Sequence, residues 1–231
     1  MGAALSSDNN NKKQAEPKPS ATPAPAPPPL PPPPPPTAFP DMFGKIIAAD
    51  PDSDEKNPDP AAPEGKVYFF EHKTKCWVKK DNIINFMLLP KSLSITWGGD
   101  TRYWTWKPFE EGSKIEVAEL KDVCWLEVDG KMELSYLTPG VVYEVVFEIM
   151  IKEVSRGWSV PVNLRLKLPY GTVQERKEHL QDKPREKWLD IPVGEIKPQK
   201  GQTGDLSISL FQFTGNWKKG LVVRGIRIAP K

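Results

Sequence analysis

Cysteine and histidine are scarce in this chain, with two of each among 231 residues. The two cysteines, Cys76 and Cys124, cannot build the disulfide framework of a small secreted domain, and their spacing matches no zinc-binding pattern. We therefore expect both thiols to be reduced, buried and inert, and we expect no metal site. His72 and His179 lie in charged, loop-like surroundings and are expected at the surface.

Long apolar runs and a strong net charge are also missing. No stretch approaches the roughly 20 apolar residues that a helix needs to cross a bilayer, and the N-terminal region lacks the apolar centre of a secretory signal. Thirty-two basic residues against thirty acidic ones leave a net charge of +2. This balance gives no electrostatic case for nucleic acid or an acidic membrane surface. We therefore expect a cytoplasmic protein that binds no nucleic acid.

One short motif bears on membranes. Met1 to Ser6 fits the N-myristoylation pattern, in which Gly2 carries the acyl chain. A single acyl chain gives only marginal membrane binding. Gly2 is therefore a minor lipidation candidate, and a membrane is a partner only if Gly2 is acylated.

Proline is abundant instead, and it is concentrated at the N-terminal side. Residues 1–62 are rich in proline, alanine and polar residues, and they include the run from Pro27 to Pro36. Such a run favours an extended polyproline II conformation and cannot form a core. We expect a disordered proline-rich head and linker that serves as a spacer, or else binds an aromatic groove of the profilin, SH3 or WW kind. The folded domain is expected at residues 63–231.

The rest of the chain has the pattern of β-strands. Apolar residues alternate with polar ones in residues 141–152, 163–168 and 206–210, which is typical of strands with one wet face. Strands at this spacing, without long helical patterns, predict an all-β antiparallel sandwich or jelly roll.

Turn signals divide these strands. Asp129-Gly130 is expected to close a two-residue hairpin, and Thr138-Pro139-Gly140 suits a type II turn. The apolar face changes parity near Gly225, which predicts a β-bulge. The polar segment 173–181 is expected to be a loop or a single helical turn.

The segment from Leu93 to Pro108 gives the best indication of function. It places Trp97, Tyr103, Trp104 and Trp106 around a Gly98-Gly99-Asp100 turn. Flat indole faces can stack on sugar rings, while Asp100 and Arg102 can hydrogen-bond their hydroxyls. Trp217 lies in another loop and is a candidate second wall. The same aromatics could instead form a core, where Trp77, Trp125, Trp158 and Trp188 are expected.

Five blocks in order give a resemblance to a known family. The blocks are 92–106, 123–147, 157–164, 187–195 and 217–221. Together they resemble the phloem protein 2 and Nictaba-type plant lectins. The resemblance implies a jelly-roll β-sandwich that binds N-acetylglucosamine oligomers and N-glycan cores without metal, cofactor or catalysis. It implies a place in the cytoplasm, nucleus or phloem sieve elements, and sugar contacts at Trp97 and Trp104.

Other functions are weighed against this lectin reading. The domain could be a phloem scaffold that has lost sugar binding, with the proline-rich head recruiting protein partners. A homodimer would raise avidity by presenting two sites. RNA binding has less support because the charge is balanced. An enzyme is not indicated, because no carboxylate pair of the glycosidase kind and no Gly-x-Ser-x-Gly motif stands out.

Overall fold

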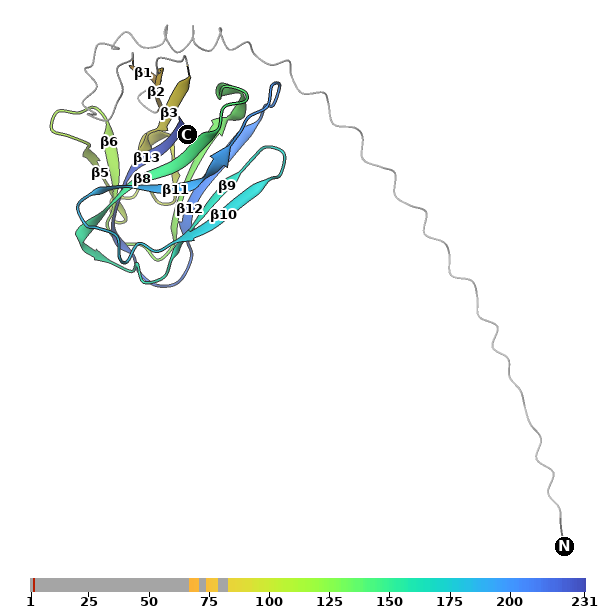
Figure 1. Cartoon of the computed structure of the whole chain (residues 1–231). Coiled ribbons are helices and arrows are strands. Elements are labelled where there is room, and N and C mark those ends of the chain that lie inside the picture. The colour runs from red at the N-terminus through yellow and green to blue at the C-terminus, as the bar shows by residue number, and fades with distance from the viewer. Residues whose placement is uncertain (1, 3–66, 71–73, 79–82) are drawn as a thin grey trace. The chain divides into compact units, whose positions relative to one another are not determined.

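The computed structural model describes Gly2 and residues 67–70, 74–78 and 83–231 (Figure 1). The proline-rich head, its boundary near residue 62, His72 and all of the lipidation motif except Gly2 lie outside the described residues. The predictions made for them therefore remain predictions. Within the described part of the chain, no helix is long and apolar enough to span a membrane.

The smaller of two antiparallel sheets has five strands. Their order across the sheet is β10-β9-β12-β7-β4. These strands are β4 (Ser94–Ile95), β7 (Leu126–Glu133), β9 (Val162–Lys167), β10 (Val173–Glu178) and β12 (Asp205–Gln212). Because the inward-facing residues of β9 and β12 alternate with polar ones, one face of this sheet is buried and the other meets solvent.

The larger sheet has eight strands, and β13 lies at its centre. β13 pairs with β8 along one side and with β3 and β6 along the other. The strands are β1 (Val67–Phe70), β2 (Thr74–Val78), β3 (Ile84–Leu88), β5 (Trp104–Pro108), β6 (Glu116–Leu120), β8 (Tyr143–Arg156), β11 (Trp188–Ile196) and β13 (Lys219–Pro230). Two short 3-10 turns, Pro90–Ser92 and Leu134–Tyr136, complete the described structure.

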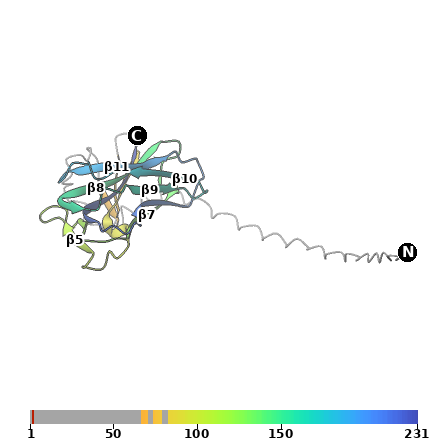
Figure 2. The ribbon, with the colours of Figure 1, turned by 90° about the horizontal axis from the view of Figure 1, so that it is seen from below.

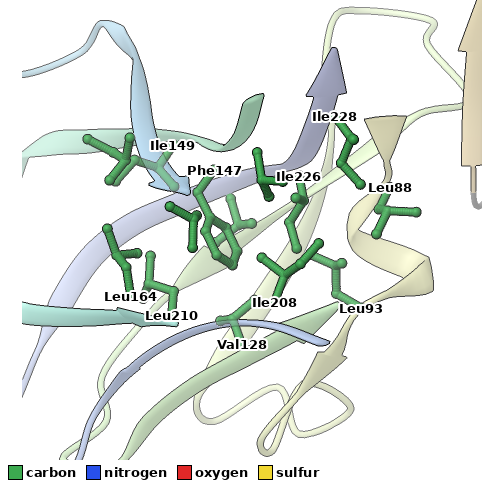
Figure 3. Packing of buried hydrophobic residues seen from close by; sticks show 14 of the residues in the cluster. Leu88, Leu93, Val128, Phe147, Ile149, Leu164, Ile208, Leu210, Ile226 and Ile228 are labelled. Atoms are coloured by element: carbon green, nitrogen blue, oxygen red, sulfur yellow. The ribbon is translucent and has the colours of Figure 1, made fainter. Parts of the chain in front are cut away.

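The two sheets pack face to face, as the two views in Figures 1 and 2 show. Figure 3 shows Phe147, Ile226 and Ile228 of the larger sheet directed toward residues of the smaller sheet. The facing side chains of the smaller sheet are Val128, Leu164, Ile208 and Leu210, all fully buried. The architecture is an antiparallel β-sandwich of the jelly-roll type, which confirms the predicted fold class.

Most of the predicted strands and turns are present. The alternating segments correspond to β8, β9 and β12. The turn at Thr138 closes with a hydrogen bond from Val141 N to Thr138 O, and Gly140 has a φ of 82°. The bulge is found where it was predicted, because the register of β13 against β8 shifts between Val223 and Gly225.

Two local predictions are wrong. Asp129-Gly130 is not a hairpin turn but the middle of β7, where Gly130 pairs with Ile208 of β12. A Cβ atom at Gly130 would lie 2.5 Å from Cδ1 of Ile226, so the Ile226 side chain packs into the space that the missing side chain leaves. The segment expected to be a loop contains β10, an edge strand that pairs with β9 along its whole length.

Candidate functional site

Four connecting segments meet at one end of the smaller sheet, where β4 and β12 finish and β7 and β9 begin. Backbone hydrogen bonds join Thr96 N to Glu127 O (3.1 Å) and Val123 N to Lys218 O (3.0 Å). The Asn216 side chain donates to Gly157 O at 2.8 Å. Loops distant in sequence are therefore held together at this end, which we call the loop end.

The loop end carries every exposed tryptophan and phenylalanine of the described residues. These are Trp97 (46% exposed), Trp125 (43%), Phe213 (43%) and Trp217 (52%). Large aromatic side chains are normally mostly buried. A group of exposed rings gathered at one end of a domain therefore indicates a binding surface.

Trp97 belongs to the polar turn predicted from the sequence. Its ring lies 5.1 Å from that of Tyr103, measured between centroids, and the Arg102 guanidinium lies 5.2 Å from the Tyr103 centroid. Arg102 also donates from Nε and Nη2 to the Asp100 carboxylate. These hydrogen bonds hold the pKa of Asp100 below its usual value. The predicted residues Trp97, Asp100, Arg102 and Tyr103 thus form one group.

The backbone of Trp97 is in an unusual conformation. Its φ is 59°, in the left-handed region that bulky residues rarely adopt. Such a conformation costs about 1–2 kcal/mol and persists only where the surroundings impose it. Here the turn is closed by hydrogen bonds from Gly98 N to Ile95 O and from Asp100 N to Trp97 O. This hydrogen-bonded turn imposes the left-handed conformation, and the Trp97 side chain at its corner is half exposed.

The prediction that Trp104 stacks on a ligand is wrong for this structure. Trp104 is 1% exposed and lies in the main core on β5. Its Nε1 donates to Thr96 O at 3.1 Å, while Nε1 of the half-buried Trp106 donates to Gly98 O at 2.8 Å. The two indoles therefore fix the backbone on both sides of Trp97. Trp104 therefore supports the turn from within the core, through its hydrogen bond to Thr96 O.

Trp125 was expected in the core, but it is exposed. It stacks on Phe213 with a centroid distance of 4.1 Å and an interplanar angle of 23°. Phe213 packs on Phe211 at 5.1 Å, and the Arg165 guanidinium lies 4.8 Å from the Phe211 centroid. Strand pairing places Phe211 opposite Glu127, which sits two residues after Trp125. The sequence analysis missed this row of rings because it expected Trp125 to be the buried residue. The buried residue is instead its neighbour Leu126, where β7 begins.

The other expected core tryptophans have different outcomes. Trp158 is buried, and its Nε1 donates to Lys219 O at 3.0 Å. Trp188 is partly buried beside Phe109, 5.7 Å away between ring centroids. The Trp77 side chain lies outside the described residues. Of the cysteines, Cys76 is buried as expected and Cys124 is only partly buried. Burial raises the pKa of the Cys76 thiol to about 11.

A buried lysine fixes the loop that carries Trp217. Lys218 is fully buried, and its Nζ donates to Cys124 O at 2.7 Å and to Asn216 O at 2.8 Å. A third, longer bond reaches Thr214 O. Burial lowers the pKa of this ammonium group. The carbonyls belong to the two segments that carry Trp125 and Trp217, so Lys218 ties these segments together.

Carboxylates and thiols do not gather into a metal site in the part of the chain that the structure describes. The loop end instead offers flat apolar rings bordered by fixed polar groups. It can therefore hold a ligand with apolar faces and hydrogen-bonding edges. The fold and this surface define an all-β sandwich protein that presents exposed aromatic rings from the loops at one end.

Comparison with known proteins identifies the family. The family model described as Phloem protein 2 matches residues 84–230. The Arabidopsis thaliana protein named Phloem Protein 2-like A1 is 46% identical over 162 residues, which is 68% of this chain and 66% of that protein. The chain belongs to the phloem protein 2 family, as its sequence blocks suggested.

Two relatives are named Lectin. The protein from Luffa acutangula is 46% identical over 167 residues, covering 71% of this chain and 79% of that protein. The protein from Coccinia grandis is 33% identical over 138 residues, covering 59% of this chain and 88% of that protein.

Proposed function

We propose that this chain is a carbohydrate-binding protein, a lectin, that binds its ligand at the loop end without metal or catalysis. The observation that carries the proposal is the set of exposed indoles there, above all Trp97, which lies exposed in a hydrogen-bonded turn beside the polar groups of Asp100 and Arg102. The relatives named Lectin support the same assignment. The ligands that the family resemblance favours are N-acetylglucosamine oligomers and N-glycan cores.

Binding would combine stacking and hydrogen bonding. The apolar C–H face of a pyranose packs on the Trp97 indole, because both surfaces are apolar and nearly flat. Asp100 and Arg102 are oriented by their mutual hydrogen bonds, and Arg102 is exposed and able to donate further. Charged groups form the stronger hydrogen bonds to hydroxyls. Trp217 supplies a second exposed ring, which extends the surface that a glycan can cover.

The test is binding of chitotriose and a glycan array to the full chain, followed by isothermal titration calorimetry. Trp97→Ala should reduce binding at least tenfold, since a lost ring removes both stacking and buried area. Tyr170→Ala is the matched control, because it removes an exposed ring at the opposite end of the smaller sheet. It should bind as the wild type does. Absence of binding to any glycan would instead favour a scaffold role.

Three further parts of the proposal concern the whole chain. We place the protein in the cytoplasm, consistent with the expectation from sequence. Homodimerisation would present two weak sites together and raise avidity. The proline-rich head would act as a spacer or recruit a partner that binds polyproline. Fluorescence microscopy tests the location, and sedimentation tests the homodimer. Pull-down with residues 1–62 tests the role of the proline-rich head.

A further inference from the structure

We propose that Trp125, Phe213 and Glu127 form a second sugar subsite beside Trp97, so that the chain recognises an extended oligosaccharide rather than a single terminal sugar. This inference rests on the proposed lectin function and deepens it. It assigns the additional units of the same neutral oligosaccharide to the row of rings on the outer face of the smaller sheet.

The two subsites are continuous in the backbone. Thr96 N donates to Glu127 O, which extends the pairing of β4 with β7 up to the residue before Trp97. Trp125 lies two residues before Glu127 on the neighbouring strand. Paired strands lie about 4.8 Å apart. The two exposed indoles therefore arise from adjacent chain segments, close enough for one oligosaccharide to reach both.

Glu127 supplies a fixed hydrogen-bond acceptor between them. Its Oε2 accepts from the Thr96 hydroxyl at 2.9 Å and from the Trp125 indole Nε1 at 3.1 Å. Among the described residues, no hydrogen bond reaches Oε1. A carboxylate oxygen can accept from a sugar hydroxyl or an acetamido N–H, and its charge strengthens that bond. Thr96 and Trp125 thus hold Glu127 in place for a ligand donor.

The rings that continue from Trp125 are held in place before any ligand arrives. Trp125 stacks on Phe213, Phe213 on Phe211, and Arg165 covers the Phe211 ring. Arg165 is itself paired with Glu175 at 2.5 Å. A preorganised ring loses little conformational freedom on binding. The negative charge of Glu127 disfavours phosphate-bearing ligands such as RNA, whereas a neutral oligosaccharide meets no repulsion.

The experiment compares chain lengths by calorimetry, with chitobiose and chitotetraose as the probes. In the wild type, chitotetraose should bind roughly three- to tenfold more tightly than chitobiose, as expected when a second ring is engaged. Trp125→Ala should remove most of that gain, because it should weaken chitotetraose binding more than chitobiose binding. Glu127→Gln keeps an acceptor for Thr96 and Trp125 but loses the charge, so it should reduce the gain only partly.

Controls separate this inference from the proposed function. Trp97→Ala should weaken both ligands, and Tyr170→Ala should weaken neither. Thermal unfolding confirms that each variant is folded. The subsite is refuted if the wild type binds both oligomers and Trp125→Ala weakens them equally or not at all. A wild-type chain that binds neither oligomer overturns the lectin proposal itself, and this inference with it.

Discussion

Trp97 and Trp104 are seven residues apart and have opposite roles. The Trp97 ring is exposed, and its backbone is strained, whereas the Trp104 ring is buried and hydrogen-bonded beneath the turn. Period-two alternation shows that Trp104 and Tyr103 face opposite sides of a strand, but it does not say which side is buried. The sequence thus identified the turn and most of its residues. Only the packing of β5 against the core separates the exposed indole from the buried one.

The strain at Trp97 can be separated from its proposed contact with sugar. Trp97→Asn removes the ring but places a residue that tolerates a left-handed φ. We expect its free energy of unfolding to stay within about 1 kcal/mol of the wild type. Trp97→Val also removes the ring but puts a β-branched side chain at the same φ, so it should be about 1–2 kcal/mol less stable than Trp97→Asn.

Urea unfolding of these two variants measures the difference, and chitotriose titration measures the common loss of binding. Equal stability of the Asn and Val variants would show that the backbone at residue 97 carries no strain.

Lys218 is a fully buried cation whose ammonium group donates only to backbone carbonyls among the described residues. Lys218→Met leaves three backbone carbonyls without their charged donor, so we expect a loss of about 2–4 kcal/mol. Burial lowers the pKa of Lys218 below its ordinary 10.5, so the unfolded chain binds the proton more tightly than the folded chain does. The Lys218 contribution should therefore grow as pH rises from neutrality toward 10.5.

Denaturant unfolding of the wild type and of Lys218→Met, at about pH 7 and about pH 10, tests this pH dependence. The other titrating groups are the same in the two proteins, so they cancel in the difference between their free energies of unfolding. A wild-type advantage over Lys218→Met that shrinks with rising pH would contradict the lowered pKa.

At the scale of elements, the strands with one buried face were the easiest to recognise, and the charged edge strand was missed. β8, β9 and β12 bury alternate residues, so their period is visible in the sequence. β10 has Glu175, Arg176 and Lys177 in succession, because it is an edge strand with little buried surface. A charged edge limits pairing with other chains. The Asp129-Gly130 pair was wrongly predicted to be a turn for another reason. Its glycine lies within β7, where the Ile226 side chain packs closely against it.

The bulge at Gly225 gives a prediction about the larger sheet. A Cβ atom at this position would lie 2.2 Å from Leu88 O, and the φ of 145° is outside the range of other residues. We expect Gly225→Ala to lower the free energy of unfolding by about 2–4 kcal/mol, because β13 must shift away from β3. Gly215→Ala is the control, since a Cβ atom there meets nothing within 4 Å. A comparable loss in both variants would exclude a role for the close approach.

At the scale of the whole molecule, balanced charge predicts how binding responds to salt. The net charge is +2, and the proposed ligand is neutral. Chitotriose affinity should therefore change less than about twofold between roughly 50 and 500 mM salt, because screening acts only on charge pairs. Binding of RNA would fall by orders of magnitude over the same range. A steep salt dependence of glycan binding would show that an ionic contact dominates the site.

The sandwich class and the family could be predicted from the sequence, because alternation and ordered blocks are properties of the chain itself. The loop end could be predicted only in part. Trp97, Asp100, Arg102 and Tyr103 are neighbours in sequence and were found together. Trp125 directly precedes β7 and Phe213 directly follows β12, so only the pairing of β7 with β12 brings them side by side.

The central place of β13 has a consequence for biosynthesis. The ribosome makes β13 after β3, β6 and β8, the three strands with which it pairs. Until then, the growing chain exposes the unpaired edges of all three. Such long-range pairing is slow and leaves partly folded chains prone to aggregation. Nascent polypeptides truncated within β13 should consequently depend on chaperones during translation and be degraded rapidly once released.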